Sequence, residues 1–422
     1  MEIFKFGGGT LKDAAAIKKM GEMMQAYKND TIIIVVSAFG KVTQMLEEIV
    51  QRKIHHKSWE NKMKALYDYH LEIVQDLFGV YNEPLEQALD RFQASLYFLP
   101  PSLESREAQE QLYSHIVSWG ENLSSKIIAA YLAHIGIPCQ WVDARSYIKT
   151  EYGRMHAIVD QQATRDAMTI GLPHLLEENN VLVMPGFIGS DSQKGYATTL
   201  GKEGSDYTGA LLAVNLQANA LRLWKDVPGV MTGDPKLFQH VQTLPEIPYE
   251  KMFEMAYYGA QVIHPNTITP LAINKIPLYI HSFTTDAPVT VIHADVEEEH
   301  EWPTYILRSG QVWLQLAAKD NSPLDAKPLG TVFVSFNRMG VNINFLDIAS
   351  PQHIKICFTD DGIHLQHLVA DLQPHFQVTH TPNASLLTIL NGDKAAEQLP
   401  MLRNATVLAQ VSFKKVMQTV FI

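Results

Sequence analysis

Cysteine is scarce in this chain, whose 422 residues include only Cys139 and Cys357. Two cysteines are too few for a disulfide framework or for a metal site built on thiolates. Long apolar runs are scarce as well, because the longest, at residues 32–36, has the length of a strand and not of a membrane span. The opening residues lack the apolar segment and cleavage site of a signal peptide. We therefore expect a cytoplasmic protein that does not bind a membrane.

Positive charge is also in deficit. The chain has 34 Lys and Arg against 45 Asp and Glu, which gives a net charge of −11, and it has no basic stripe. Binding to nucleic acid needs clustered positive charge, so we expect no nucleic-acid partner. The remaining composition, 46% apolar and 19% charged, is typical of a globular protein, and 422 residues are enough for two to four domains.

Several catalytic signatures are missing too. The chain has no Gly-x-Ser-x-Gly turn and no cluster of Cys and His. Its first glycine run, Gly7 to Gly9, is not a P-loop, because Lys5 precedes the glycines and the Gly-Lys-Ser/Thr ending is absent. The run does not match Gly-x-Gly-x-x-Gly either. The sequence therefore excludes the commonest hydrolase and nucleotide-binding fingerprints.

The glycine run, Gly7 to Gly9, joins a strand to a helix. Residues 2–6 have the pattern of a buried strand, and apolar residues recur at helical spacing after Thr10 and Asp13, which form a capping pair. The backbone N–H groups of Gly7 to Gly9 can then approach an anion, and Lys5 adds a full positive charge. The alternative is a tight turn beside a surface lysine.

The same order of strand, loop and helix recurs along the chain. The stretch 199–209 places glycines, hydroxyls, Lys202 and Asp206 between an apolar strand and an apolar helix, and similar loops follow strands at 31–36 and 221–224. Open α/β sheets bind ligands where strands end and helices begin. Glycine backbones and lysines can hold phosphates, Asp206 can orient the lysines or a metal, and Mg²⁺ bridges nucleotide phosphates with few protein carboxylates. These features predict phosphoryl transfer, and the alternative for 199–209 is an ordinary capped loop.

Residues 51–115 have a different pattern, which predicts a layer of helices with solvated faces. Residues 118–124 open a further helix that covers 126–133, and Glu121 lies at its start. Glu121 is either a ligand-binding acid or an acid favoured there by the helix dipole.

The last third of the chain is compositionally distinct and follows a Pro- and Glu-rich linker. Its pattern predicts strands and helices in the order βαββαβ and then βαββ, with helices at 329–339 and 394–402. The near-repeat indicates two small α/β modules packed sheet to sheet, an architecture common in effector-binding and subunit-binding regions. The alternative is one irregular α+β domain.

Eight segments carry a resemblance to a known family. They are Lys5-Phe-Gly-Gly8, Val36-Ser-Ala38, Trp119-Gly-Glu121, Gly186-Phe-Ile-Gly189, Thr198-Thr-Leu-Gly201, Gly204-Ser-Asp-Tyr207, Asp226-Val-Pro-Gly-Val-Met-Thr-Gly-Asp-Pro235 and Gly259-Ala-Gln-Val-Ile-His-Pro265. In this order they resemble the aspartokinases, a branch of the amino-acid kinase family, and the tail resembles the paired ACT domains of that branch.

The resemblance implies an α/β fold with three layers: an open, mainly parallel sheet with helices on both faces, followed by two small α+β ACT-like modules. The expected domains are a catalytic domain over 1–283, with a helical subregion at about 51–135, and a linker over 284–303. The ACT-like region is expected over 304–422, its modules at about 311–381 and at about 304–310 with 383–422.

The implied activity is ATP-dependent phosphorylation of the β-carboxylate of L-aspartate to 4-phospho-L-aspartate, the first step of lysine, threonine and methionine synthesis. Lys5 would neutralise the transferring phosphoryl group, and Asp206 would organise the lysines. ATP, with Mg²⁺ held mainly by its phosphates and by no dedicated protein metal site, would contact Gly7, Gly8, Gly9, Lys225, Asp226, Asp234, Lys236 and Gln261. Aspartate would be bound by Ser37, Thr43, Phe187, Lys202 and Ser205, with Glu121 receiving its α-amino group. A lysine or threonine effector at the ACT-like modules and a homodimer or higher homo-oligomer are further expectations.

Five substitutions depart from the pattern of the family. Lys202 and Glu203 stand where the family has Arg-Gly, and a lysine supplies charge without the planar fork of arginine. Gln261 stands where the family has a lysine that contacts the ATP phosphates, and Lys225, which replaces a threonine, compensates if it points into the site. Lys236 replaces an arginine. Two alternatives therefore stand beside an active aspartokinase: a catalytically impaired paralogue that acts as a binding or regulatory subunit, and a kinase for another amino-acid carboxylate.

Overall fold

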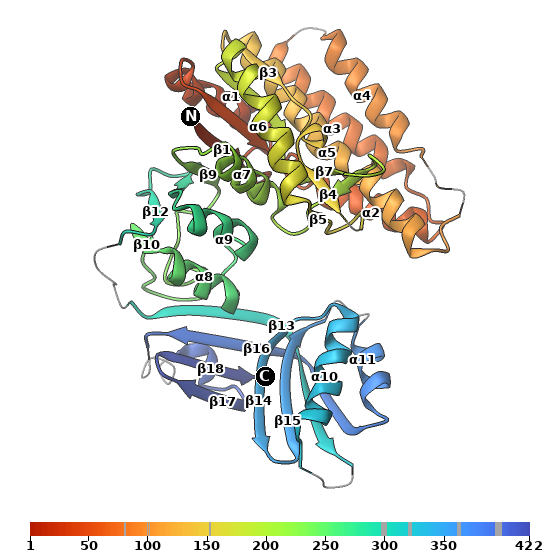
Figure 1. Cartoon of the computed structure of the whole chain (residues 1–422), viewed down its shortest axis with the longest axis vertical. Helices are drawn as coiled ribbons and strands as arrows, with labels where there is room; N and C mark the ends of the chain where they lie inside the picture. Colours follow the sequence, from red (N-terminus) through yellow and green to blue (C-terminus); the bar gives the residue numbers. More distant parts are fainter. Residues whose placement is uncertain are drawn as a thin grey trace. The chain divides into compact units, whose positions relative to one another are not determined.

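The computed structural model describes nine stretches of the chain, and the statements below concern these residues: 1–79, 82–98, 100, 102–151, 153–296, 302–319, 323–360, 364–392 and 399–422. The chain forms two compact units (Figure 1). The first unit contains residues 1–230, 243–253 and 262–297, and the second unit contains 231–242, 254–261 and 298–422.

A mainly parallel sheet forms the centre of the first unit. Among the described residues its eight strands follow the order β10-β12-β11-β9-β1-β2-β6-β3, and only the β11–β12 pair is antiparallel. Every residue of β2 and β6 is buried, as expected of parallel strands covered on both faces. The strands are β1 (Glu2–Phe6), β2 (Ile32–Val36), β3 (Cys139–Trp141), β6 (Val181–Pro185), β9 (Leu221–Lys225), β10 (Glu246–Pro248), β11 (Leu278–Ser282) and β12 (Thr290–His293).

Helices cover both faces of this sheet. The connections from β1 to β2 through α1 and from β6 to β9 through α7 run in opposite directions along the sheet, so right-handed crossovers place α1 and α7 on opposite faces. In agreement, α1 contacts α3 and α5, whereas α7 contacts α6 and α9. The predicted three-layer fold is confirmed. The helices are α1 (Ala14–Met24), α2 (Val42–Ile54), α3 (Glu60–Phe78), α4 (Glu83–Ser95), α5 (Arg106–His134), α6 (Gln161–Glu178), α7 (Gly204–Asn215), α8 (Tyr249–Tyr258) and α9 (Pro265–Asn274), with short 3₁₀ turns at Gln25–Tyr27 and Ala144–Ser146.

The start predicted for the helix that carries Glu121 was wrong. α5 begins at Arg106, where the hydroxyl of Ser105 caps it by accepting a hydrogen bond from the Ala108 amide at 3.2 Å. Glu121 therefore lies in the helix interior, and the helix dipole does not explain it. Gly120 is tolerated inside the helix because a Cβ there would lie 3.0 Å from the Cβ of Ala38, which needs the space.

The predicted cap of the first helix also needs correction. Asp13 alone is the N-cap of α1, and its carboxylate accepts a hydrogen bond from the Ala16 amide at 2.8 Å. Thr10 instead donates its hydroxyl to the Trp224 carbonyl at 3.1 Å and so ties the glycine run to the neighbouring strand β9.

A small second sheet connects β6 to α7 and determines the backbone conformation around residues 199–209. Its strands, in the order β5-β4-β7-β8, are β5 (Ile158–Val159), β4 (Lys149–Glu151), β7 (Ile188–Asp191) and β8 (Ala197–Thr199). Phe187 and Glu203 flank the β7–β8 hairpin with φ of 69° and 53°, a left-handed conformation that reverses the chain. The hydroxyl of Thr208 then accepts the Phe187 amide at 3.1 Å, which fastens the hairpin to α7.

Residues 290–293 fall in the predicted linker, yet they form β12, which pairs with both β10 and β11. The alternation of buried and half-buried residues in β12 agrees with a strand that has one face on the core. Among the described residues, no helix of either unit has the length and apolar character needed to cross a bilayer.

The second unit is built on one antiparallel sheet. Its described strands follow the order β14-β15-β13-β16-β18-β17, and the 15-residue strands β13 and β16 pair along most of their length. The two predicted modules therefore share a continuous sheet, and packing sheet to sheet was wrong. The elements are β13 (Thr304–Ala318), α10 (Ala326–Met339), β14 (Ile343–Ser350), β15 (His353–Thr359), α11 (His364–Leu372), β16 (Phe376–Leu390), a 3₁₀ turn (Pro400–Leu402), β17 (Val407–Phe413) and β18 (Val416–Phe421).

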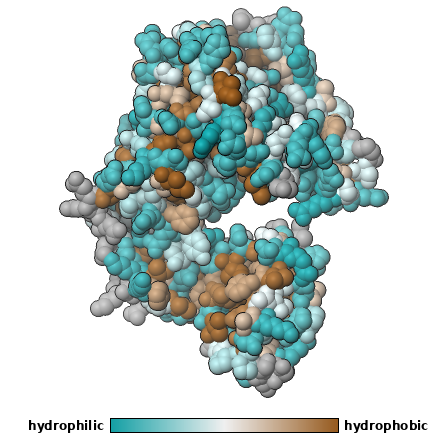
Figure 2. Space-filling model, in the orientation of Figure 1, coloured by the Kyte–Doolittle hydropathy of each residue, from teal (hydrophilic) through white to brown (hydrophobic). Residues whose placement is uncertain are grey.

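Part of the helix predicted at 394–402 lies outside the described residues, and only its last three residues are seen, as the 3₁₀ turn. The helices α10 and α11 pack on the first half of the sheet through Val332, Phe336 and Leu368. The edge strands β14 and β17 leave apolar side chains in solvent, among them Ile348 and Phe413. Figure 2 shows apolar residues gathered on the visible face of this unit.

Candidate active site

Several predicted site residues of the first unit lie where neighbouring parallel strands end. β9, β1, β2 and β6 are adjacent and parallel, so their carboxyl ends meet at one edge of the sheet. Lys5 lies near the end of β1 and pairs in register with Leu223 of β9, so Lys225 ends the next strand two residues beyond that pair. Ser37 follows β2, and Gly186 follows β6.

Two lysines and one aspartate from three elements form what we call the lysine cluster: Lys5, Asp206 and Lys225. Asp206 lies in the first turn of α7 and is 1% exposed. The ammonium of Lys5 forms an ion pair with one carboxylate oxygen, and the ammonium of Lys225 lies 2.8 Å from the other. Lys225 also donates a hydrogen bond to the backbone carbonyl of Val262. The structure thus brings together the two residues predicted as catalytic and adds Lys225 to them.

The cluster carries more positive than negative charge. Burial disfavours the ionised form of Asp206, but Lys225 and Lys5 outweigh burial and lower the pKa of this carboxyl to about 2. Burial likewise opposes the charge on Lys225, yet Asp206 and Glu203 outweigh it and raise the pKa of that ammonium. Within the cluster itself, one carboxylate between two ammonium groups leaves one positive charge over, which suits it to bind an anion. Glu203 and Asp226 lie outside the cluster and also act on Lys225.

The glycine run packs directly against this cluster. A Cβ on Gly7 would lie 3.7 Å from the Lys5 ammonium nitrogen, and one on Gly9 would lie 3.0 Å from a carboxylate oxygen of Asp226. The Gly7 amide donates to the Trp224 carbonyl at 3.3 Å, whereas the amides of Gly8 and Gly9 have no acceptor among the described residues. Gly8 and Gly9, and not Gly7, therefore offer free N–H groups to an anion.

Gly8 offers a direct structural test. A methyl group on Gly8 would lie 2.4 Å from the Ala38 carbonyl oxygen, and this contact is with rigid backbone. We expect Gly8→Ala to lower the free energy of unfolding by about 1–3 kcal/mol, because the two loops must move apart. Thermal melting measures the change, and Gly330→Ala in α10, where a Cβ meets nothing within 4 Å, is the matched control. Equal melting of the two variants would contradict the close packing.

A buried acid, Glu121, lies next to the loop that contains Ala38. Glu121 is 2% exposed, its Oε1 accepts from the Thr43 hydroxyl at 3.4 Å, and its Oε2 has no hydrogen-bond partner among the described residues. Burial raises the pKa of Glu121 to about 8, although hydrogen bonds from the Ala38 amide and from Thr43 oppose the rise. Ala38 contacts Gly8 on one side and Glu121 on the other, so one loop connects the glycine run to the buried acid.

Three further predicted substrate residues surround the start of α7. Ser205 precedes Asp206, and a Cβ on Gly186 would lie 2.6 Å from the Cβ of Ser205, so the β6 loop touches the helix here. The ring of Phe187 packs on Gly204 in the same way. Lys202 is exposed one residue before the N-cap Glu203. The hydroxyl of Ser124 donates to the Ser37 carbonyl at 2.9 Å, which places Ser37 beside α5.

Asp234, Lys236 and Gln261 belong to the second unit. The carboxylate of Asp234 accepts the Lys236 amide at 2.9 Å and so closes its own turn, and both residues are exposed. The role of these three residues in a nucleotide site stays a prediction. Asp226, in the first unit, is exposed beside Gly9.

Three groups at this edge of the sheet were not predicted from the sequence. They are the Ala38 amide, the Val262 carbonyl and the hydroxyl of Thr208. The first two are backbone atoms, which every residue has, so no side-chain pattern reports them. Thr208 could have been found as an isolated hydroxyl on the apolar helix that follows Asp206. In the described parts of the chain, no group of three or more His, Cys, Asp or Glu is arranged to hold a metal ion.

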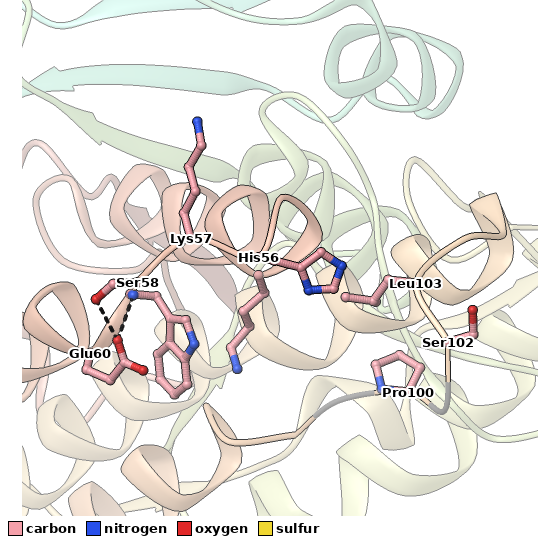
Figure 3. A pocket seen from close by; sticks show the side chains of 9 residues that line it. His56, Lys57, Ser58, Glu60, Pro100, Ser102 and Leu103 are labelled. Atoms are coloured by element: carbon pink, nitrogen blue, oxygen red, sulfur yellow. Dashed lines mark hydrogen bonds between the residues drawn. The ribbon is translucent and has the colours of Figure 1, made fainter.

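A cavity of about 440 Å³ lies between the end of α2, the start of α3 and the residues Pro100, Ser102 and Leu103 (Figure 3). Oε2 of Glu60 accepts the Ser58 hydroxyl at 2.8 Å and the Trp59 amide at 2.9 Å. The ammonium of Lys53 lies 3.6 Å from the centre of the Trp59 ring, and burial lowers the pKa of Lys53 to about 8. No residue predicted for the site lines this cavity.

Comparison with known proteins places these features in a family. The family model "Amino acid kinase family" matches residues 1–282. Aspartokinase 1, chloroplastic, of Arabidopsis thaliana is 26% identical over 427 residues, which cover 97% of this chain and 72% of that protein. The lysine-sensitive aspartokinase 3 of Escherichia coli is 30% identical over 282 residues, which cover 66% of this chain and 61% of that protein. Some other relatives are longer, and the chain spans about half of their length.

A solved structure extends the likeness to both units. Escherichia coli aspartokinase III, crystallised with lysine and aspartate, is 25% identical, with a TM-score of 0.77 over 100% of this chain and 95% of that one. Its likeness includes the region that follows residue 282, where the family model ends. The family model covers about two thirds of the chain, and on this evidence the chain belongs to the amino acid kinase family and resembles its aspartokinases throughout.

Proposed function

We propose that the chain transfers the terminal phosphoryl group of ATP to the β-carboxylate of L-aspartate and so forms 4-phospho-L-aspartate. The observation that carries this proposal is the lysine cluster, whose excess positive charge lies at the same sheet edge as the buried acid Glu121, of which Oε2 has no hydrogen-bond partner among the described residues. An anion-binding group and an ammonium-binding group at one edge fit a phosphate donor and an amino-acid acceptor. The aspartokinase names of relatives that span most of this chain support the same reading.

Phosphoryl transfer of this kind depends on position and charge more than on covalent catalysis. Lys5 would neutralise the charge that develops on the transferring group, and Asp206 would hold Lys5 in place. The free amides of Gly8 and Gly9 would bind phosphate oxygens beside it. Mg²⁺, bound by the nucleotide phosphates, would supply further charge neutralisation when present.

The acceptor would be oriented by its own charges. Glu121, ionised on binding, would receive the α-ammonium group of aspartate, with Thr43 supporting the carboxylate. Lys202 and Ser205 would bind the α-carboxylate from the start of α7. The β-carboxylate would then face the lysine cluster, which keeps the attacking oxygen and the phosphoryl group close together.

The second unit would regulate this activity. We propose that its sheet and helices bind an amino-acid effector, lysine or threonine, and that its apolar edge strands β14 and β17 contribute to a homo-oligomer. The related Escherichia coli aspartokinase III was crystallised with lysine as well as aspartate, which supports an effector role for lysine. The product would enter the synthesis of lysine, threonine and methionine.

Coupled ADP release with L-aspartate and Mg-ATP tests the proposal, with a known aspartokinase as positive control. We expect aspartate-dependent turnover that falls when lysine or threonine is added. Turnover with another amino-acid carboxylate, and not with aspartate, would identify a different kinase. ATP binding without turnover of any acceptor would overturn the enzymatic proposal and favour a binding or regulatory subunit.

A further inference from the structure

The cavity between the end of α2 and the start of α3 combines charged and apolar walls. Two lysines and one acid line it, together with apolar surface from Pro100 and Leu103. Figure 3 shows the ring of His56 directed toward Leu103, while the side chain of Lys57 extends away from the other labelled residues. The volume of about 440 Å³ lies in the range of pockets that hold a small molecule.

The ammonium of Lys53 is buried in the wall of this cavity without a hydrogen-bond acceptor. Lys53 is 4% exposed, and its nitrogen has no hydrogen-bond partner among the described residues. The nitrogen lies 3.6 Å from the centre of the Trp59 ring, whose face attracts the charge. An indole face does not replace the acceptors that the three N–H groups of an ammonium can use. Since a buried donor without an acceptor is unfavourable, Lys53 is a group that a ligand would satisfy.

The acid nearest in the sequence does not supply the missing acceptor. Oε2 of Glu60 accepts the Ser58 hydroxyl at 2.8 Å and the Trp59 amide at 2.9 Å, so it is engaged in the turn before α3. Burial lowers the pKa of Lys53 to about 8, and the charge of Glu60 opposes this shift only in part. Lys53 therefore remains mostly charged at pH 7, while no anion among the described residues accepts its hydrogen bonds.

We propose that this cavity binds a small organic carboxylate with an apolar body, whose carboxylate accepts hydrogen bonds from the Lys53 ammonium. The flexible stem of a lysine lets its ammonium turn from the indole face toward the cavity, and the hydrogen bond that results is charge-assisted. The apolar body would lie against Pro100 and Leu103. Inorganic phosphate fits less well, because it has nothing to place against these apolar walls.

The alternative is a lysine that the Trp59 ring alone holds in place, beside a cavity that binds no ligand. The proposed site shares no residue with the lysine cluster or with the residues around Glu121. The inference therefore does not depend on the proposed function, and its test needs no turnover. A protein that phosphorylates no aspartate would refute the kinase proposal and leave the binding constants for this cavity to be judged by themselves.

A set of matched ligands tests the chemistry on the wild-type protein. Ligand-observed NMR titration measures the dissociation constants of phenylacetate, phenylacetamide, acetate and inorganic phosphate. We expect phenylacetate to bind at least about tenfold more tightly than phenylacetamide, which lacks the charge, and than acetate, which lacks the apolar body. Equal binding of phenylacetate and phenylacetamide, tighter binding of phosphate, or no binding of phenylacetate at millimolar concentration would overturn the inference.

A pair of lysine variants locates the site. Lys53→Met keeps the length of the side chain and removes the ammonium, so we expect it to weaken phenylacetate binding by at least about tenfold. Lys64→Met removes an exposed lysine of α3 that pairs with Asp68, and it should leave the binding unchanged. Binding within twofold of the wild type in a folded Lys53→Met would place the ligand elsewhere and overturn the inference. If Lys53→Met does not fold, the comparison of phenylacetate with phenylacetamide on the wild type still decides.

Discussion

Replacing Lys5 with alanine should reduce kcat by at least about a thousandfold, the upper range for removal of one group that stabilises transition-state charge. The side chain of Lys5 is 8% exposed at the end of a buried strand and its ammonium is held by Asp206, so it is fixed before the substrate binds. A fixed charge in a site of low dielectric stabilises developing negative charge more strongly than a mobile surface lysine would. Steady-state ADP release with saturating aspartate and Mg-ATP measures the change.

The fold should survive this substitution. Asp206 keeps its second partner, Lys225, at 2.8 Å, so the buried carboxylate is not left without a counter-charge. We expect the free energy of unfolding to fall by no more than about 1–3 kcal/mol, below the 3–5 kcal/mol typical when a buried charge loses its only partner. Lys18→Ala, which removes an exposed lysine of α1, is the control. Retention of more than about a tenth of kcat by a folded Lys5→Ala would contradict the role of Lys5, since a single charge contact is worth more.

Replacing Glu121 with glutamine should reduce kcat/KM for aspartate by about a hundredfold to a thousandfold, because truncating one member of a buried charge pair costs several kcal/mol. Glutamine keeps the size of the side chain and removes only its charge. Folding should be unimpaired, since Glu121 is fully buried with one oxygen unpaired and its pKa is raised to about 8, so the neutral form is already favoured at pH 7.

The pH dependence of the same variant gives an independent check. In the free protein Glu121 is protonated below about pH 8 and must lose this proton to bind an ammonium group. We therefore expect kcat/KM for aspartate to rise with pH between about 6 and 8, by up to about tenfold per unit, and then to level off. Glu121→Gln should remove this slope. An identical slope in both proteins would show that another group titrates.

The contribution of Glu121 to the free energy of unfolding should change with pH in the direction opposite to kcat/KM. Burial raises the pKa of Glu121 from 4.5 to about 8, so between these values the folded state holds a proton that the unfolded state has lost. The contribution of Glu121 to stability therefore falls as pH rises through this window, by roughly 1.4 kcal/mol per unit. Glu121→Gln should melt higher than the wild type near pH 8 and nearly equally near pH 5.

The sheet and its binding edge could be predicted because they rest on strong local signals. Runs such as residues 31–36 can only be buried strands, and each ends in a loop of glycines, hydroxyls and charges. Lys5 and Asp206 stand out in those loops, and the structure brings them into contact. The charged residues could thus be identified from the sequence. Their proximity in space depends on the order of the parallel strands, which the structure shows.

Other features depend on contacts between distant residues. The helix that carries Glu121 was predicted to start at residues 118–124, but α5 runs through Gly120, because the absent Cβ makes room for Ala38. The sequence indicated that the Gly7 amide is free to bind an anion, but this amide donates a hydrogen bond to the Trp224 carbonyl of the neighbouring strand β9. The position of the Lys225 ammonium could not be predicted, because it depends on the Val262 carbonyl, a backbone group that no side-chain pattern reveals. In each case the partner lies more than thirty residues away in the chain, outside the range of any local pattern.

The continuous sheet of the second unit has a consequence for its cooperativity. β13 pairs with β16 from Thr304 to Ala318, so each of these strands crosses from one module into the other. Opening either module would strip backbone hydrogen bonds from a strand that the other module also needs. The two modules should therefore unfold together as one unit, and a chain cut before β16 would leave β13 with one of its two neighbours and neither module intact.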